Sequence, residues 1–197
     1  MSSQRLTKRI VIWLVALVCL FALWLVWANL FTVPPEKPSP KYETQIVSER
    51  HVAGLILESP GDFQDMVVDF GPANEAIEKV DGHKAVIGGL ELQVTRILYK
   101  DGIALSLEGS VQGSIAGFGR APGLRDLKHT EVPCNVSGKP AVRVSISAEH
   151  GVVGVQAERL TILDGQTLYD VQALCESRDS RASEEAKKIL DSIKIGS

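Results

Sequence analysis

Side chains able to do chemistry are few in this sequence and stand far apart. The four histidines, His51, His83, His129 and His150, show none of the i, i+4 spacing that brings two metal ligands onto one helix face. No G-x-S-x-G motif places a serine nucleophile on a sharp turn, and no G-x-x-x-x-G-K-[ST] loop could hold a phosphate. We therefore predict no metal site, no cofactor and no catalytic residue, and we expect a protein that is not an enzyme.

One basic cluster could recognise a partner. Arg120, Arg125 and Lys128 lie within residues 119–128 (GRAPGLRDLK), a stretch whose glycine and proline content predicts a loop. Loops carry much of protein recognition, so this loop could bind an acidic partner. An ordinary solvated connector is the alternative that these residues leave open.

The longest apolar stretch, IVIWLVALVCLFALWLVWANL, runs from residue 10 to residue 30 without a charged side chain. As a helix that rises ~1.5 Å per residue, it would reach about 31 Å, the thickness of a bilayer's hydrocarbon core. We predict a transmembrane signal-anchor helix over residues 10–31. A cleaved signal peptide is the alternative, because Val26-Trp27-Ala28 has the small-residue spacing of a cleavage site.

Charge beside this stretch predicts its orientation. Arg5, Lys8 and Arg9 precede it, and positive residues next to a first span stay in the cytoplasm. We expect a cytoplasmic tail over residues 1–9 and a single-pass protein of the cell membrane, with its domain extracytoplasmic and, in a Gram-negative cell, periplasmic. The prolines that follow predict an extended, Pro-rich stalk over residues 32–41.

The remainder, residues 42–197, is long enough to form one domain with a substantial core. Without the three basic residues of the tail, 18 of the 21 Lys and Arg residues remain against 24 Asp and Glu residues, a net charge of −6. An acidic domain repels nucleic acid and anionic lipid head groups. We predict that it binds no nucleic acid and that its partner is another envelope protein.

Turn and capping signals predict the first elements of the domain. Proline opens a short helix over residues 73–80. Asp101-Gly102 favours the two-residue turn of a β-hairpin between residues 90–100 and 103–108. Ser110 is the expected cap of a short helix, which presents three apolar side chains on one side: Val111, Ile115 and Phe118.

A meander of antiparallel strands is predicted to follow, from residue 131 to residue 175. Pairing across His150-Gly151 sets Ala148 against Val153, and pairing across Asp164-Gly165 sets Arg159 against Asp170. Ser183 is the expected cap of a last helix over about residues 183–193. That helix has one apolar stripe, which consists of Ala186, Ile189, Leu190 and Ile193.

The two cysteines of the domain leave a question open. An oxidising compartment favours a disulfide between Cys134 and Cys175. In a meander taken in chain order, however, they lie three strand spacings of ~4.8 Å apart, about 14 Å in all. A disulfide needs Cα atoms within ~7 Å of each other. The bridge therefore stays a possibility that strand order decides.

These elements predict an α+β fold, in which an antiparallel sheet of meander and hairpin is packed by short helices and a C-terminal helix and preceded by one transmembrane helix. The hairpin, the short helix, the strands from Val132 to Cys175 and the closing ILDSIKI segment, over about residues 43–197, together resemble the PsbP/Mog1-like α/β sandwich family. This resemblance implies binding and accessory roles and carries over no catalytic residue.

The function that we expect is that of a membrane-anchored, extracytoplasmic, non-catalytic binding or accessory module. Two other classes remain as alternatives. One is a small-ligand sensor, in which sheet and helix enclose an apolar cavity. The other is a hydrolase whose Ser, His and acidic side chains meet only in the fold.

Overall fold

The computed structural model describes residues 47–68 and 70–196, all within the second of the two units into which the chain divides, Met1–Ser39 and Pro40–Ser197. The predicted tail, signal-anchor helix and stalk, residues 1–41, lie outside the described residues. Within the described part, no helix has the length and apolar character needed to cross a membrane.

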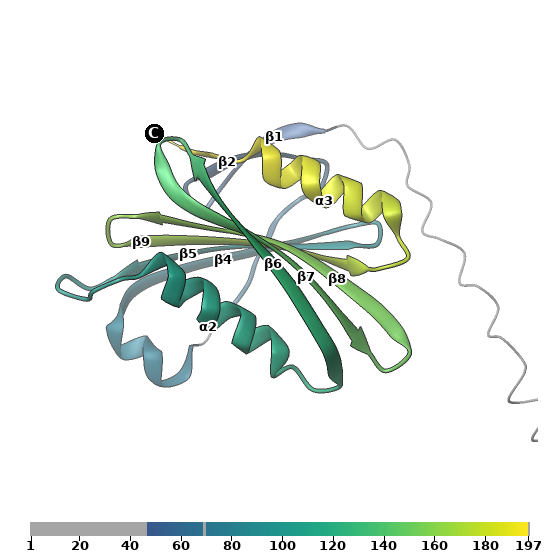
Figure 1. The fold of residues 1–197 in the computed structure, drawn as a ribbon. Helices are drawn as coiled ribbons and strands as arrows, with labels where there is room; N and C mark the ends of the chain where they lie inside the picture. The colour runs from purple at the N-terminus through teal and green to yellow at the C-terminus, as the bar shows by residue number, and fades with distance from the viewer. Residues whose placement is uncertain (1–46, 69, 197) are drawn as a thin grey trace, which may run out of the picture. The chain divides into compact units, whose positions relative to one another are not determined.

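An antiparallel sheet of seven strands forms the centre of the domain, in the order β3-β4-β5-β9-β8-β7-β6 (Figure 1). The strands are β3 (Gln64–Asp65), β4 (Ile77–Ile87), β5 (Leu90–Tyr99), β6 (Leu124–Val136), β7 (Lys139–His150), β8 (Val153–Asp164) and β9 (Thr167–Glu176). The meander predicted for the second half is confirmed as β6 to β9. The chain then adds β9 to β5, so the two halves of the domain share one sheet.

The two faces of this sheet are covered differently (Figure 1). On one face, here called the α3 face, lie helix α3 (Ser180–Ser192) and a small sheet of three strands, β1 (Ser48–Val52), β2 (Leu55–Ser59) and β10 (Lys194–Ile195). On the other, the α2 face, lies helix α2 (Leu107–Gly119). Helices on an antiparallel sheet make an α+β domain, as the sequence predicts.

Helix α3 packs through the predicted apolar stripe. Its Ala186, Ile189 and Leu190 are at most 2% exposed, and they belong to the same core as Leu92 and Val171 of the sheet. The helix starts earlier than expected, because Asp179 and not Ser183 is the N-cap. The Asp179 carboxylate accepts a hydrogen bond of 2.9 Å from the Ala182 N–H.

Helix α2 is also longer than predicted, since its N-cap is Ser106, whose hydroxyl accepts from the Gly109 N–H. Its buried residues Val111 and Ile115 form a second core with Val144, Ile146 and Ala157 on the α2 face. The helix covers only part of that face. This leaves room beside it for the site described below.

The first hairpin was predicted in the wrong place. Strand β5 pairs with β4 across Gly88-Gly89, and residues 103–106 run without regular structure into α2. Gly88 has φ +58°, which a two-residue hairpin loop needs, whereas capping by Ser106 commits the chain after Asp101-Gly102 to helix. The helix predicted over residues 73–80 is likewise wrong, because a short 3₁₀ helix, η1 (Gly71–Ala76), leads directly into β4.

The meander registers differ from the predicted ones by two residues. Ala148 pairs with Val155 instead of Val153, because the loop after β7 begins at Gly151, whose φ is +64°. Glycine at the first central position of a two-residue loop matches a type II′ turn, while a His-Gly or Asp-Gly loop places it second. A shift of two residues keeps every side chain on its face, so the predicted core is retained.

The two cysteines in the described part of the chain, Cys134 and Cys175, are both free, so the disulfide that the sequence left open does not form between them. Cys134 is exposed on the edge strand β6 and Cys175 is buried on β9, with β7 and β8 between them. Burial, and to a smaller extent the nearby carboxylates of Asp179 and Glu158, together raise the pKa of the Cys175 thiol to about 11.

The two thiols should therefore differ in their reactivity toward an alkylating reagent. At pH 8, a thiol of pKa about 11 has only about one thousandth of its population as reactive thiolate. We expect iodoacetamide to label Cys134 fully in the folded full chain, while Cys175 reacts only after unfolding in urea. Mass spectrometry of the two tryptic peptides measures this directly, and equal labelling of both in the folded chain would contradict the placement of Cys175.

Candidate functional site

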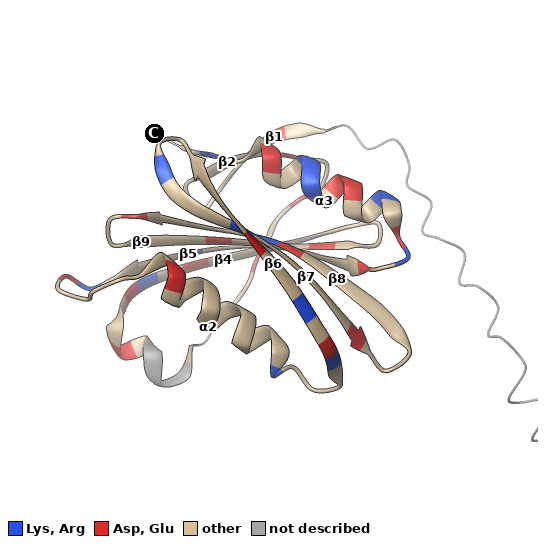
Figure 2. Cartoon of the chain, viewed as in Figure 1, with Lys and Arg blue, Asp and Glu red and all other residues tan. Residues whose placement is uncertain are grey.

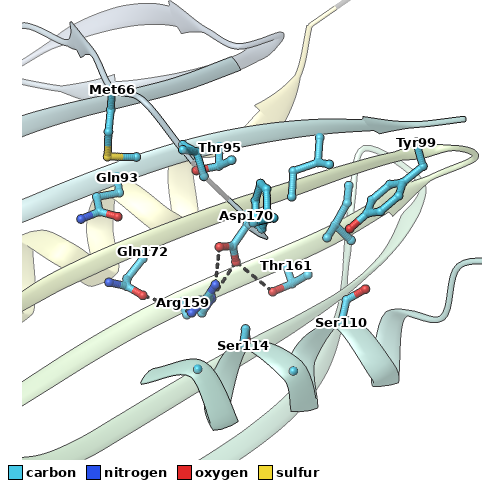
Figure 3. A pocket seen from close by; sticks show the side chains of 16 residues that line it. Met66, Gln93, Thr95, Tyr99, Ser110, Ser114, Arg159, Thr161, Asp170 and Gln172 are labelled. Carbon is cyan, nitrogen blue, oxygen red and sulfur yellow. Dashed lines mark hydrogen bonds and ion pairs between the residues drawn. The ribbon is translucent and has the colours of Figure 1, made fainter. Parts of the chain in front are cut away.

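A pocket of about 500 Å³ lies between α2 and the α2 face of strands β5, β9 and β8 (Figure 3). This volume falls within the about 300 to 1,000 Å³ typical of small-molecule sites. The pocket exists because α2 turns small residues toward the sheet: Ser110, Gly113, Ser114 and Gly117. These residues recur at i, i+3, i+4 and i+7 and therefore share one side of the helix.

The floor of the pocket is built from rows of side chains that lie in register across the three strands. One row is polar and basic, the next is polar and acidic, and the third is apolar. The rows are Gln93–Gln172–Arg159, then Thr95–Asp170–Thr161, then Ile97–Leu168. Each of these residues sits two positions from the next along its strand, so all of them face the same side of the sheet.

The centre of the floor is an ion pair between Arg159 and Asp170 (Figure 3). The Arg159 Nε donates to Asp170 Oδ1 over 2.7 Å, and its Nη2 donates to Oδ2, so the pair is bidentate. Thr161 donates a further hydrogen bond of 3.2 Å to Asp170 Oδ1. The two charged side chains are 14% and 16% exposed. Their charges cancel, which leaves a polar floor without net charge.

The two side walls of the pocket differ in structure. Met66, Val68 and Phe70 form one wall, and the Met66 N–H anchors it by donating to the Gly82 carbonyl over 2.8 Å. On the opposite wall, a Cβ built on Gly113 or Gly117 would meet nothing within 4 Å. Helix α2 itself carries a single charged residue, Glu108, so this wall is almost uncharged (Figure 2).

The serine and tyrosine hydroxyl groups that line the pocket either donate hydrogen bonds within their own helix or stay protonated. The hydroxyls of Ser110 and Ser114 donate to carbonyls of their own helix, over 2.9 and 2.7 Å. Burial, and secondarily the Asp170 carboxylate, raises the pKa of the Tyr99 phenol, so it stays protonated at neutral pH. Among the described residues that line the pocket there is no histidine. This arrangement suits binding better than proton transfer or nucleophilic attack.

The predicted basic loop is mostly not a loop. Arg120 is the C-cap of α2, and β6 begins at Leu124, so Arg125 and Lys128 lie on an edge strand next to a β-bulge. The Arg125 Nη2 donates to the Gly151 carbonyl over 2.7 Å. None of the three lines the pocket. The strand forms because these residues pair with β7. The glycines and proline nearby predict a loop, so the sequence pattern does not indicate this pairing.

Sequence reasoning missed the pocket residues, although one signal pointed to them. The predicted meander sets Arg159 against Asp170, an opposite-charge pair, on a strand face expected to be solvated. In the structure Arg159 lies opposite Gln172 and Thr161 lies opposite Asp170, and the guanidinium reaches diagonally to the carboxylate. The position of α2 over this face has no signal in the local pattern, because it depends on how the chain returns from β5.

No family model matches this sequence, and no curated protein matches it. Among solved structures, the chain is similar to the solution structure of cyanobacterial PsbP (CyanoP) from Synechocystis sp. PCC 6803, with a TM-score of 0.51 and 10% identity over 82% of this chain and 99% of that one. The resemblance to the PsbP-like fold that the sequence predicts is therefore confirmed as a similarity of fold.

Two other solved structures match with lower TM-scores. One is PA94, a protein of unknown function from Pseudomonas aeruginosa, with a TM-score of 0.39 and 14% identity over 74% of this chain and 94% of that one. The other is LpqN of Mycobacterium tuberculosis, involved in cell envelope biogenesis, with a TM-score of 0.41 and 12% identity over 83% of this chain and 99% of that one.

Proposed function

We propose that this chain is a non-catalytic accessory module that binds a small ligand in the pocket between α2 and the sheet. The observation that carries the proposal is the pocket's construction. Its volume is about 500 Å³, and the charges of Arg159 and Asp170 on its floor neutralise each other. The hydroxyls of its two serines donate hydrogen bonds to carbonyls of their own helix. A hydrolase would need an activated nucleophile there, so binding is the better-supported function.

The setting of the module is proposed from the sequence. The uncharged stretch over residues 10–30, with Arg5, Lys8 and Arg9 before it, supports a membrane anchor that holds the domain outside the cytoplasm. The similarity of fold to cyanobacterial PsbP, which extends over 99% of that chain, supports the accessory role that the resemblance in sequence implies.

A protein partner is the second candidate. Strand β6 pairs with β7 alone among the described strands, and most of its residues, including Arg125 and Lys128, are exposed. An open edge strand can accept a strand from another protein. Photo-crosslinking through Cys134 in intact cells should then trap one envelope protein, while crosslinking from a cysteine placed at the exposed Val86 of a Cys134→Ser chain should not.

Filling the pocket should abolish ligand binding without loss of stability. The chain has two methionines, Met1 and Met66, so ¹³C-methyl methionine labelling gives one reporter inside the pocket. We expect 2-naphthol, an uncharged aromatic probe, to shift the Met66 methyl resonance of the full chain in lipid nanodiscs. Gly117→Leu should remove this shift, because its side chain occupies the pocket and its Cβ meets no atom within 4 Å.

The matched control is Ala116→Leu, which adds the same side chain at the neighbouring exposed position of α2, outside the pocket. This variant should bind 2-naphthol as the wild type does. Replacing a helix glycine should also stabilise α2 by about 1 kcal/mol, so the Gly117→Leu chain remains folded. A saturable Met66 shift that survives in Gly117→Leu, or none in the wild type, would refute the proposed function.

A further inference from the structure

At the polar end of the pocket, the Gln93 side-chain oxygen and the Gln172 side-chain N–H groups lie side by side without a partner among the described residues. Gln93 Nε2 donates to Glu91 Oε1 over 2.7 Å, so its carbonyl oxygen remains for a ligand. Gln172 Oε1 accepts from Arg159 Nη1 over 3.1 Å, so its amide hydrogens remain. Gln93 and Gln172 are direct neighbours across β5 and β9. An acceptor next to a donor matches the edge of an amide group, which presents one N–H and one C=O together.

The charges of the floor disfavour an ionised ligand. A carboxylate placed at Arg159 would also meet Asp170, and an ammonium placed at Asp170 would meet Arg159. Either ion would lose its hydration without gaining a free counter-charge, because the bidentate pair already uses both groups. The site therefore selects an uncharged head group.

The opposite end of the pocket suits an apolar body. Ile97 and Leu168 are 4% and 6% exposed and form the last row of the floor, and Phe70 lines the wall. Between the two ends lies Thr95, which is 8% exposed and adds a hydroxyl group to the floor. The pocket therefore has a polar end and an apolar end.

We infer that the pocket binds an uncharged amphipathic molecule through an amide group held between Gln93 and Gln172, with its apolar part over Ile97 and Leu168. This inference rests on the proposed ligand-binding function. It adds the chemical class of the ligand and the two residues that select it.

Four six-carbon compounds that differ only in head group test the inference: hexanamide, 1-hexanol, hexanoate and hexylamine. Each is titrated into the labelled full chain in nanodiscs while the Met66 methyl resonance is followed. We expect hexanamide to bind about tenfold more tightly than hexanol and either ion, since it makes one more hydrogen bond at an otherwise unsatisfied pair. Gln93→Leu should cost hexanamide about fivefold and leave the affinity for hexanol unchanged.

The outcomes separate this inference from the proposed function. Equal binding of all four compounds, or tightest binding of hexanoate, would overturn the amide assignment while leaving the pocket as a binding site. An unchanged hexanamide affinity in Gln93→Leu would also overturn it. If neither these compounds nor 2-naphthol moves the Met66 resonance, the proposed function itself fails.

Discussion

Asp170→Asn is expected to lower the free energy of unfolding by about 3 kcal/mol, because it leaves the Arg159 guanidinium with little access to water and no counter-charge. The wild-type carboxylate accepts two hydrogen bonds from Arg159 and one from Thr161. Breaking one member of a mostly buried pair costs far more than the pair contributes as a whole. Urea unfolding of the full chain in nanodiscs, followed by the strand signal in circular dichroism, measures the loss.

Asp164→Asn provides the matched control. Asp164 also pairs with a cation, since the Lys139 Nζ lies 2.6 Å from its Oδ1, but these side chains are 44% and 31% exposed. Such a pair contributes at most about 1 kcal/mol. The double variant Arg159→Met/Asp170→Leu should recover most of the stability lost in Asp170→Asn, because no charge is then left unpaired. Equal small losses in Asp164→Asn and Asp170→Asn would contradict the burial of the floor.

Gly82→Ala should displace the Met66–Val68 wall and weaken ligand binding. A Cβ at position 82 would lie 2.5 Å from Val68 Cγ2 and 2.7 Å from the Met66 carbonyl oxygen, and backbone cannot move aside as a flexible side chain can. The strain should cost about 1 to 3 kcal/mol and break the hydrogen bond from the Met66 N–H to the Gly82 carbonyl. We expect a changed Met66 methyl resonance in the free chain and reduced affinity for 2-naphthol.

A glycine-to-alanine substitution on α2 should instead raise the free energy of unfolding. A Cβ at Gly113 meets nothing within 4 Å, so Gly113→Ala should stabilise the chain by about 1 kcal/mol through helix propensity alone. The contrast separates a steric effect at Gly82 from a general response to losing glycine. If Gly82→Ala is as stable as the wild type and binds 2-naphthol equally well, the wall does not pack against β4 as described.

The sequence predicts the parts of this fold that depend on local patterns. The alternation in β7 and the stripe Ala186, Ile189, Leu190 and Ile193 in α3 both indicate which side chains are buried, and the structure buries them. Even the error of two residues in register preserves these faces, because side chains alternate with a period of two. Local periodicity is therefore enough to predict the α+β class and most of the core.

The site could not be predicted in the same way, because long-range pairing builds it. Pairing of β5 with β9 brings Gln93 beside Gln172 although 79 positions separate their numbers. An Asp-Gly turn signal at residues 101–102 competes with the capping signal of Ser106, and only packing of α2 onto the sheet decides between them. The polar residues of β8 and β9 look solvated in sequence, since nothing local indicates that a helix covers them.

The most direct test of the pocket is to locate a bound probe by intermolecular nuclear Overhauser effects between 2-naphthol and the methyl groups of the full chain in nanodiscs. We expect contacts from the probe to the methyls of Met66, Ile97 and Leu168, which line the pocket. Contacts instead to Leu92, Val171 or Leu190, which form the core on the α3 face, would contradict it.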